Sequence, residues 1–216
     1  HIKKELVSQT YHPGSYHTFY VHDPKKRLIS AAPIRDRIVH HALIAVIGSW
    51  LERSFIEHSY ACRKGKGTHK AIAHAQENAQ KYFYYVHFDV VKFFDSITHE
   101  ILLKMLGKKI ADSNKIWLLE KIIFHPAPNM SQRKSIPIGN LTSQYFGNLY
   151  LDALDHFVKD KMGVKAYLRY MDDILVFEND KENLLSICQA IKEFTKAKLE
   201  LDLTSDGIQP IFSGIP

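Results

Sequence analysis

The sequence has few cysteines and no long apolar run, and each of these absences removes a class of protein. Only two cysteines, Cys62 and Cys188, occur in the chain, far apart and without a CxxC spacing, so neither a disulfide framework nor a cysteine zinc site is indicated. The longest apolar stretch, residues 42–51, has about half of the ~20 residues that a membrane-spanning helix requires. No charged-then-apolar leader precedes it. We therefore expect a soluble cytoplasmic protein with reduced thiols.

Positive charge and apolar residues, by contrast, are plentiful. Lysine and arginine number 29 against 23 acidic residues, and the resulting net charge of +6 favours a polyanionic partner, with nucleic acid as the first candidate. Apolar residues make up 45% of 216 positions, enough for the core of one domain or two small ones, which argues against disorder. The chain starts at His1 and stops at Pro216 without a polar tail, so we expect a fragment of a longer protein.

Hydrophobic periodicity predicts a mixed chain that begins with an irregular segment. Residues 1–23 show neither a helical nor a strand period, and the five-residue spacing of His12, His17 and His22 does not suit a metal site on either element. Strands are expected at 26–32, 84–91, 166–170, 174–177 and 199–203, and helices at 36–55, from 68 to about 82, from 98 onwards, at 113–124, within 136–159 and at 181–198. Thr68 and Thr98 are the expected N-caps of two of these helices.

From residue 84 onwards, the order is strand, helix, strand, strand, helix, strand once the helices within 136–159 and before are set aside as insertions. This is the split βαβ, ferredoxin-like order, in which the first and third strands are adjacent and antiparallel. Asp89 lies near the end of the first strand, and Asp172 and Asp173 begin the third. The topology therefore predicts that these carboxylates converge at one rim of the sheet.

Three carboxylates held close together repel one another unless a cation lies among them. Oxygen ligands of this kind suit Mg²⁺, with Mn²⁺ as a substitute, and two such ions can clamp an in-line phosphoryl transfer. Adjacent aspartates in a hairpin are also ordinary turn residues, so Asp172 and Asp173 alone do not establish a metal site. The convergence with Asp89 and the basic charge favour the metal interpretation.

Two segments resemble known catalytic motifs. Residues 166–177, Ala-Tyr-Leu-Arg-Tyr-Met-Asp-Asp-Ile-Leu-Val-Phe, resemble the YxDD hairpin of reverse transcriptases, and residues 88–97 resemble the first catalytic strand of that family. Residues 27–41 and 59–68 resemble the two finger motifs of the bacterial, group II intron-like members. The resemblance covers nearly the whole chain and implies a bacterial or phage-encoded enzyme.

The implied fold is α+β, with the fingers and palm of a right-hand polymerase. Fingers are expected in residues 1–83, including the irregular N-terminal segment. The palm is expected in residues 84–216, as a ferredoxin-like antiparallel sheet with packed helices, inserted helices and the motif-B loop. A thumb would begin beyond Pro216.

The segment at residues 137–144 narrows the resemblance. Most reverse transcriptases carry Pro-Gln-Gly here and Ser-Pro further on, whereas this chain has Ile138 in place of the Gln and Gln144 in place of the Pro. That variant is most similar to the reverse transcriptases of diversity-generating retroelements, where it accompanies misincorporation opposite template adenines. An aliphatic Ile138 cannot offer the incoming nucleotide the hydrogen bonds of an amide, so discrimination would lose a polar check.

The resemblance assigns roles around the carboxylates. Asp89 and Asp172 are the expected bridging metal ligands, Asp173 a weaker and partly electrostatic one, and the backbone carbonyl of Val90 an added ligand. Phe94 resembles the steric gate that excludes a ribose 2′-hydroxyl, although a core aromatic is the alternative interpretation.

Other residues are expected to bind substrates. Those expected to contact the triphosphate are Arg27, Arg35 and Arg37; those near the nascent base pair are Ile138, Gly139 and Gln144; those on nucleic acid are Lys64, Lys66, Lys92, Tyr170 and Met171. For the arginines and lysines a salt-bridged or solvated surface side chain is the alternative, and for Gly139 a plain turn. The expected partners are an RNA template, a DNA or RNA primer, dNTPs and a small accessory protein, with no membrane.

One departure from the family pattern leaves the catalytic rate and the biological role open. A lysine usual after the last helix is missing from residues 202–207, Asp-Leu-Thr-Ser-Asp-Gly, so catalysis would be slower or another group would serve. Besides an active reverse transcriptase, a maturase-like RNA-binding protein with vestigial polymerase activity and a phage-defence polymerase of related type remain as alternatives.

Overall fold

The computed structural model describes residues 1–23, 25–128 and 133–215. The chain forms two compact units, each built from two separate stretches. Unit 1 comprises His1–Arg53 and Phe94–Tyr150, and unit 2 comprises Ser54–Phe93 and Leu151–Pro216. The expected division into fingers (1–83) and palm (84–216) stays a prediction, because the units group residues by contact and not by polymerase subdomain.

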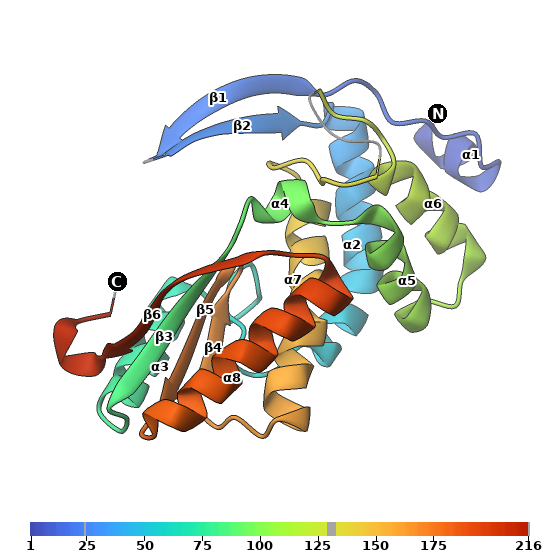
Figure 1. The fold of residues 1–216 in the computed structure, drawn as a ribbon. Helices are drawn as coiled ribbons and strands as arrows, with labels where there is room; N and C mark the ends of the chain where they lie inside the picture. Colours follow the sequence, from blue (N-terminus) through green and yellow to red (C-terminus); the bar gives the residue numbers. More distant parts are fainter. Residues whose placement is uncertain (24, 129–132, 216) are drawn as a thin grey trace. The chain divides into compact units, whose positions relative to one another are not determined.

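Unit 2 contains the four-stranded antiparallel sheet that the strand order predicts. Its strands are β3 (Tyr84–Val90), β4 (Tyr167–Tyr170), β5 (Asp173–Glu178) and β6 (Leu203–Pro210), in the spatial order β4-β5-β3-β6 (Figure 1). The first strand of the set, β3, pairs antiparallel with the third, β5, and with the last, β6. This is the ferredoxin-like arrangement, so the expected α+β fold with an antiparallel sheet is confirmed.

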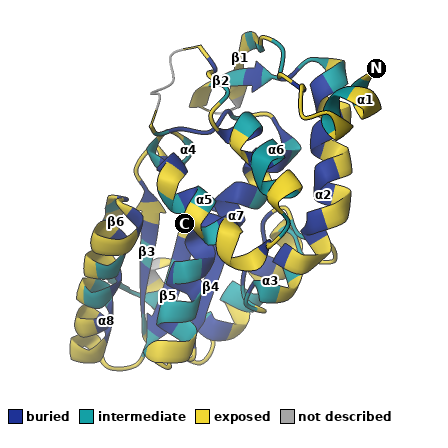
Figure 2. Ribbon diagram, turned by 90° about the vertical axis from the view of Figure 1, so that its right-hand side faces the viewer, coloured by how far each residue is buried: buried dark blue, intermediate teal, exposed yellow. Residues whose placement is uncertain are grey.

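Helices cover both faces of this sheet. Strand alternation places Val86 and Phe88 on one face, where α8 (Lys181–Phe194) packs and Lys192 lies over the Phe88 ring (Figure 1). Tyr85 and His87 lie on the other face, which α3 (Thr68–Ala79) covers. Figure 2 shows buried residues along β3, β4 and β5, as expected for strands enclosed between two layers of helix.

The start of the last strand was predicted in the wrong place. Residues 199–203 are expected to be extended, but α8 continues into a π-helical turn at Thr195–Leu199 and β6 begins only at Leu203. At the junction, the buried Thr195 hydroxyl donates to the Ile191 carbonyl of α8 at 2.7 Å. Leu199 and Leu201 are fully buried by packing, not by strand pairing.

The N-terminal segment is more regular than predicted. Residues 1–23 contain α1 (Ile2–Val7) and β1 (His17–Asp23), and β1 pairs with β2 (Lys25–Ala31) from His17–Ala31 to Asp23–Lys25. The irregular assignment was wrong because a two-stranded hairpin exposes much of both faces. Phe19, Tyr20 and Val21 are all exposed, so no apolar alternation marks the strand.

The remaining helices lie close to the expected positions, except the short α4, which falls in a stretch where no helix is expected. They are α2 (Ile34–Ser54), α4 (Phe93–Ser96), α5 (His99–Lys109), α6 (Ser113–Ile123) and α7 (Leu141–His156), with a π-helical turn at Phe157–Lys161 and a 3₁₀ turn at Ile211–Ser213. Thr68 is not an N-cap: Gly67 holds that position, and the Thr68 hydroxyl lies 3.0 Å from the Tyr170 hydroxyl instead. Within the described ranges, no helix combines the length and apolar character of a membrane span.

Candidate active site

The β3–β5 register brings two of the predicted carboxylates together. The paired positions run to Phe88–Ile174, and the next residue on each strand is Asp89 and Asp173, respectively. Residues opposite each other in a sheet share a face, so both side chains lie on the face that also carries His87. Both residues are exposed, and Asp172 directly precedes Asp173, in the turn between β4 and β5. The topology therefore places the three acids at one rim, as expected.

The turn that carries Asp172 is hydrogen-bonded to a buried arginine of β4, Arg169. Met171 has a positive φ of 55°. This conformation costs a non-glycine residue free energy, so it persists only where surrounding contacts hold the backbone in place. Arg169, with 0% exposure, donates from Nη1 to the Met171 carbonyl at 3.0 Å. The guanidinium thus fixes the backbone immediately before Asp172.

Arg169 is itself fixed by a fully buried carboxylate. Its Nε and Nη2 donate to the two oxygens of Asp155 on α7 at 2.8 Å and 2.6 Å, a bidentate pair. The Tyr167 hydroxyl donates to Asp155 Oδ1 at 2.6 Å. Burial acts to lower the pKa of Arg169, but the Asp155 charge more than offsets it and the pKa lies above its usual value. Arg169 is therefore charged at any physiological pH.

The backbone of Arg169 joins the hairpin to the segment before α3. Arg169 N–H donates to the His58 carbonyl, and Tyr60 N–H donates to the Arg169 carbonyl, both at 2.9 Å. Next to it, the Tyr170 and Thr68 hydroxyls lie 3.0 Å apart. The YxDD-like segment is thus bound to residues 58–68, a stretch that includes the second finger-like motif at residues 59–68.

One rim carboxylate has a partner that the sequence did not suggest. His87 Nε2 lies 2.9 Å from Asp173 Oδ1. This hydrogen bond raises the pKa of His87, and the charges of Asp173, Asp89 and Asp206 act in the same direction, while partial burial opposes them. Asp173 is therefore engaged with an imidazole on the same sheet face.

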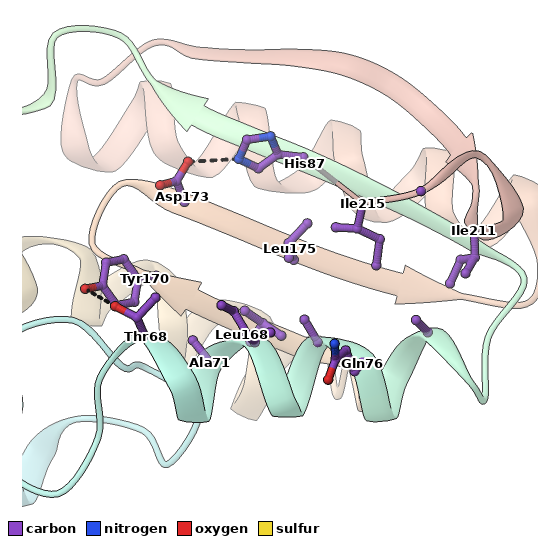
Figure 3. A pocket seen from close by; sticks show the side chains of 14 residues that line it. Thr68, Ala71, Gln76, His87, Leu168, Tyr170, Asp173, Leu175, Ile211 and Ile215 are labelled. Carbon is purple, nitrogen blue, oxygen red and sulfur yellow. Dashed lines mark hydrogen bonds and ion pairs between the residues drawn. The ribbon is translucent and has the colours of Figure 1, made fainter. Parts of the chain in front are cut away.

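A largely apolar cavity lies beside this pair. It has a volume of about 820 Å³ and lies between α3 and the face of β3, β4 and β5 (Figure 3). Ala71, Leu168 and Leu175 contribute apolar walls, and the His87–Asp173 pair and the Tyr170–Thr68 pair mark one end of it. The polar groups of the candidate site thus border an apolar interior.

The three carboxylates are of the ligand type that Mg²⁺ prefers, and the strand register brings them to one rim, but their side chains are not arranged around a common ion position. Oxygen-only ligands suit this ion, and Asp89, Asp172 and Asp173 supply them at one rim. Among the described residues, however, no group of three or more His, Cys, Asp or Glu side chains is arranged to hold a metal. Asp173 Oδ1 is directed to a protein donor, His87 Nε2.

In unit 1, residues 136–140, for which a motif-B loop is expected, form a loop before α7 that is hydrogen-bonded to β2. Ser30 N–H donates to the Ile138 carbonyl at 2.9 Å, and the buried Asn140 side chain donates to the Ser30 carbonyl at 3.0 Å. Gly139 has a φ of 111°, and a Cβ there would lie 2.7 Å from Ile29 Cγ2. A side chain at Gly139 would therefore be strained by its backbone conformation and crowded by Ile29. Ile138 is partly buried.

The other substrate-binding candidates of unit 1 have mixed surroundings. Arg35 forms an ion pair with Glu5, donates to the His12 carbonyl at 3.0 Å and stacks on the Tyr11 ring, which supports the salt-bridged alternative for this arginine. Arg27, Arg37 and Gln144 are exposed, and Phe94 is partly buried in α4. Their predicted roles remain predictions.

The basic candidates of unit 2 also differ. Lys66 forms an ion pair with Glu57 and donates to its carbonyl at 2.8 Å, so it is engaged within the protein. Lys64 and Lys92 are exposed, and Lys92 has a positive φ of 46° just after β3. Val90, the expected carbonyl ligand, is buried at the end of the same strand.

A ferredoxin-like palm sheet with an Asp-Asp hairpin beside a strand-end aspartate defines the class of right-hand nucleic-acid polymerases. The family described as "Reverse transcriptase (RNA-dependent DNA polymerase)" matches residues 21–205, and the chain belongs to this family. A Sicinivirus 3Dpol RNA dependent RNA polymerase has the same fold, with a TM-score of 0.56, 16% identity, and coverage of 95% of this chain and 48% of that one.

Three curated relatives match long stretches of this chain. The group II intron-encoded protein LtrA of Lactococcus lactis is 25% identical over 211 residues, covering 93% of this chain and 35% of LtrA. Protein YkfC of Escherichia coli is 22% identical over 95% of this chain and 65% of YkfC. The Ec83 retron reverse transcriptase of Escherichia coli is 30% identical over 52% of this chain and 38% of its own length. The chain thus spans less than two thirds of these relatives.

Sequence reasoning missed three residues of the site: His87, Asp155 and Arg169. Arg169 and Asp155 lie within apolar stretches, where a charged residue gives no sign of its partner. His87 did carry a usable signal, because it precedes Asp89 by two residues in a strand and therefore shares its face.

Proposed function

We propose that this chain carries the active site of an RNA-directed DNA polymerase, which adds dNTPs to a primer 3′-hydroxyl on an RNA template. The observation that carries the proposal is the placement of Asp89 beside the Asp172-Asp173 turn in a reverse transcriptase palm. The net charge of +6 suits a chain that holds template and primer. A small accessory protein, as expected from the resemblance, belongs to the same proposal.

Asp89 and Asp172 are the proposed Mg²⁺ ligands, with the Val90 carbonyl beside them. When bound, two Mg²⁺ ions supply charge stabilisation for an in-line displacement at the α-phosphate, and Mn²⁺ can replace them. Arg169 holds the turn so that Asp172 keeps its place, and Phe94 excludes a ribose 2′-hydroxyl. The exposed Arg27 and Arg37 are better placed than Arg35 to meet a triphosphate, because Arg35 is already paired.

Incorporation of dNTPs on an RNA template with Mg²⁺, measured with the full-length protein, tests the proposal. Asp89→Asn and Asp172→Asn should each lower incorporation by at least about 100-fold, because each removes a charged ligand of the ion. Asp202→Asn removes the same charge from an exposed surface pair with Lys196 and should retain activity. An active Asp172→Asn variant, or an inactive wild type, would exclude the proposed reaction.

We further propose error-prone synthesis of the kind found in diversity-generating retroelements. The support is the aliphatic Ile138 next to Gly139, where an amide would offer hydrogen bonds to the new base pair. Sequencing of the cDNA should show errors concentrated at template adenines, and Ile138→Gln should reduce them. A uniform error spectrum in the wild type would contradict this.

A maturase-like role is the second candidate. It is favoured by two relatives whose names point to introns: the intron-encoded LtrA and the nuclear intron maturase 2 of Arabidopsis thaliana, 23% identical over 58% of this chain. In that case intron RNA binding would survive Asp172→Asn unchanged. A binding assay with both proteins therefore separates RNA binding from DNA synthesis.

A further inference from the structure

We propose that His87 is a positioning residue that holds the Asp173 carboxylate and so leaves Asp89 and Asp172 as the ion-binding pair. The inference rests on the proposed function, because it assigns a division of labour among the acids of that same site. His87 touches neither substrate nor reacting atoms and would act through Asp173.

The strand register places His87 and Asp173 in contact. His87 lies opposite Leu175 in the β3–β5 register, and Asp173 is two residues before Leu175, so the pair is a diagonal contact on one sheet face (Figure 3). The Nε2–Oδ1 distance is 2.9 Å. Backbone pairing on both strands therefore fixes the two Cβ atoms, and the side chains meet without help from a loop.

An irregularity in the sheet lies at the same residue. The β3–β6 register shifts between Val86, opposite Ile208, and Phe88, opposite Ser205, so Asp206 and Gly207 of β6 bulge opposite His87. Such bulges re-aim side chains next to functional sites. Asp206 adds a negative charge near His87, while the hydrogen bond goes to Asp173.

The contact has a chemical consequence for the rim. The imidazole takes up one of the acceptor sites of the Asp173 carboxylate and, as the donor, sets the orientation of that carboxylate. Asp173 is held in this way, whereas Asp89 is exposed at the end of β3. His87 thus keeps Asp173 as a nearby negative charge and not as a third ligand.

The contact is expected to add little to stability, which makes it testable. The side chains of His87 and Asp173 are 25% and 55% exposed, and pairs of this kind are worth about 0–1 kcal/mol. Replacing His87 should therefore leave the fold intact, as urea unfolding in EDTA will show. Any change in ion binding or turnover then reports positioning.

The experiment compares His87→Leu, which has no donor, with His87→Gln, whose amide keeps one, in the full-length protein. Mn²⁺ affinity is measured from the electron paramagnetic resonance signal of the free ion. The values of kcat and KM are measured by dNTP incorporation. With Asp173 released onto the ion, His87→Leu should bind Mn²⁺ about 3- to 10-fold more tightly. Its kcat should fall about 10-fold with an unchanged KM. His87→Gln should resemble the wild type in both measurements.

The Asp173 background provides the decisive control. His87→Leu should lose its effect on Mn²⁺ binding when combined with Asp173→Asn, and keep it when combined with Asp206→Asn, which removes a charge but no hydrogen bond. Equal effects in both backgrounds, weaker Mn²⁺ binding by His87→Leu, or a His87→Gln variant that matches His87→Leu would overturn the inference. An inactive wild type would remove the proposed polymerase reaction instead, and the Mn²⁺ measurements would then decide the role of His87 alone.

Discussion

The hairpin turn, residues 170–173 of unit 2, and the motif-B loop, residues 136–140 of unit 1, both hold a strained backbone position, but by different kinds of interaction. Each carries proposed site residues and contains a backbone position with positive φ, 55° at Met171 and 111° at Gly139. The hairpin turn is held by a buried ion pair, and the motif-B loop by neutral hydrogen bonds.

The charged support is concentrated in one side chain. Arg169 donates two hydrogen bonds to Asp155 and one to the Met171 carbonyl. The side chains of Arg169 and Asp155 are both fully buried. Because both charges are shielded from water, each relies on the other as its charged partner, with the Tyr167 hydroxyl as a further donor to Asp155. We therefore expect the turn to lose its support when either member of this pair is removed.

The neutral support is spread over several groups. Asn140 accepts from Ala32 N–H at 3.2 Å and donates to the Ser30 carbonyl at 3.0 Å, and Ser143 donates to the Pro137 carbonyl at 2.6 Å. Each such bond contributes about 0.5–1.5 kcal/mol, so losing one weakens the loop without removing it. The comparison predicts a steep response to substitution in the hairpin and a graded one in the loop.

The largest effect should come from Arg169→Met. It leaves the Asp155 carboxylate buried without its cation, and breaking such a pair costs about 3–5 kcal/mol of the free energy of unfolding. Chemical denaturation measures the loss. Lys196→Met breaks an exposed pair with Asp202 and should cost less than about 1 kcal/mol. If Arg169→Met were as mild as Lys196→Met, the turn would not depend on the ion pair.

A somewhat smaller effect is expected from acid acting on His40 of unit 1. Burial lowers the pKa of His40 to about 4 from its usual 6.5, although the nearby Asp36 charge opposes the shift. The unfolded chain takes up the proton below about pH 6.5 and the folded chain only near pH 4, so stability is full above pH 6.5 and is lost as the pH falls towards 4. The expected loss is about 3 kcal/mol.

Denaturation midpoints between pH 7 and pH 4 check this expectation. His40→Gln removes the titrating group and should flatten the decline, whereas the exposed neighbour His41→Gln should not. A decline of the same size in both variants would assign the acid sensitivity to other groups.

The convergence of the carboxylates was predictable because it follows from topology. Strand composition located β3 and the β4–β5 hairpin, and the split βαβ order then made the end of β3 the neighbour of the start of β5. Asp89 and Asp173 meet there without any knowledge of side-chain packing.

The supports of the site were not predictable in the same way. Burial of the Arg169 charge depends on Asp155 of α7, which lies 14 residues earlier in the chain. The His87–Asp173 contact depends on the register between two strands that bring together residues 86 positions apart in sequence. β1 was missed because its hairpin buries neither face well enough to impose alternation. Patterns report which face is buried; they do not report which partner satisfies a polar group.

The smallest effect completes the comparison, in the motif-B loop. Gly139→Ala forces a side chain into a φ of 111° and places Cβ 2.7 Å from Ile29 Cγ2, so stability should fall by about 1–3 kcal/mol. Gly107→Ala is the matched control, because Gly107 lies inside α5 with nothing within 4 Å of its would-be Cβ. Alanine there should stabilise the helix by about 0.5–1 kcal/mol. Because neutral bonds remain around the loop, Gly139→Ala should unfold cooperatively at a lower denaturant concentration, and a loss as large as that of Arg169→Met would show that the loop is no more tolerant than the hairpin turn.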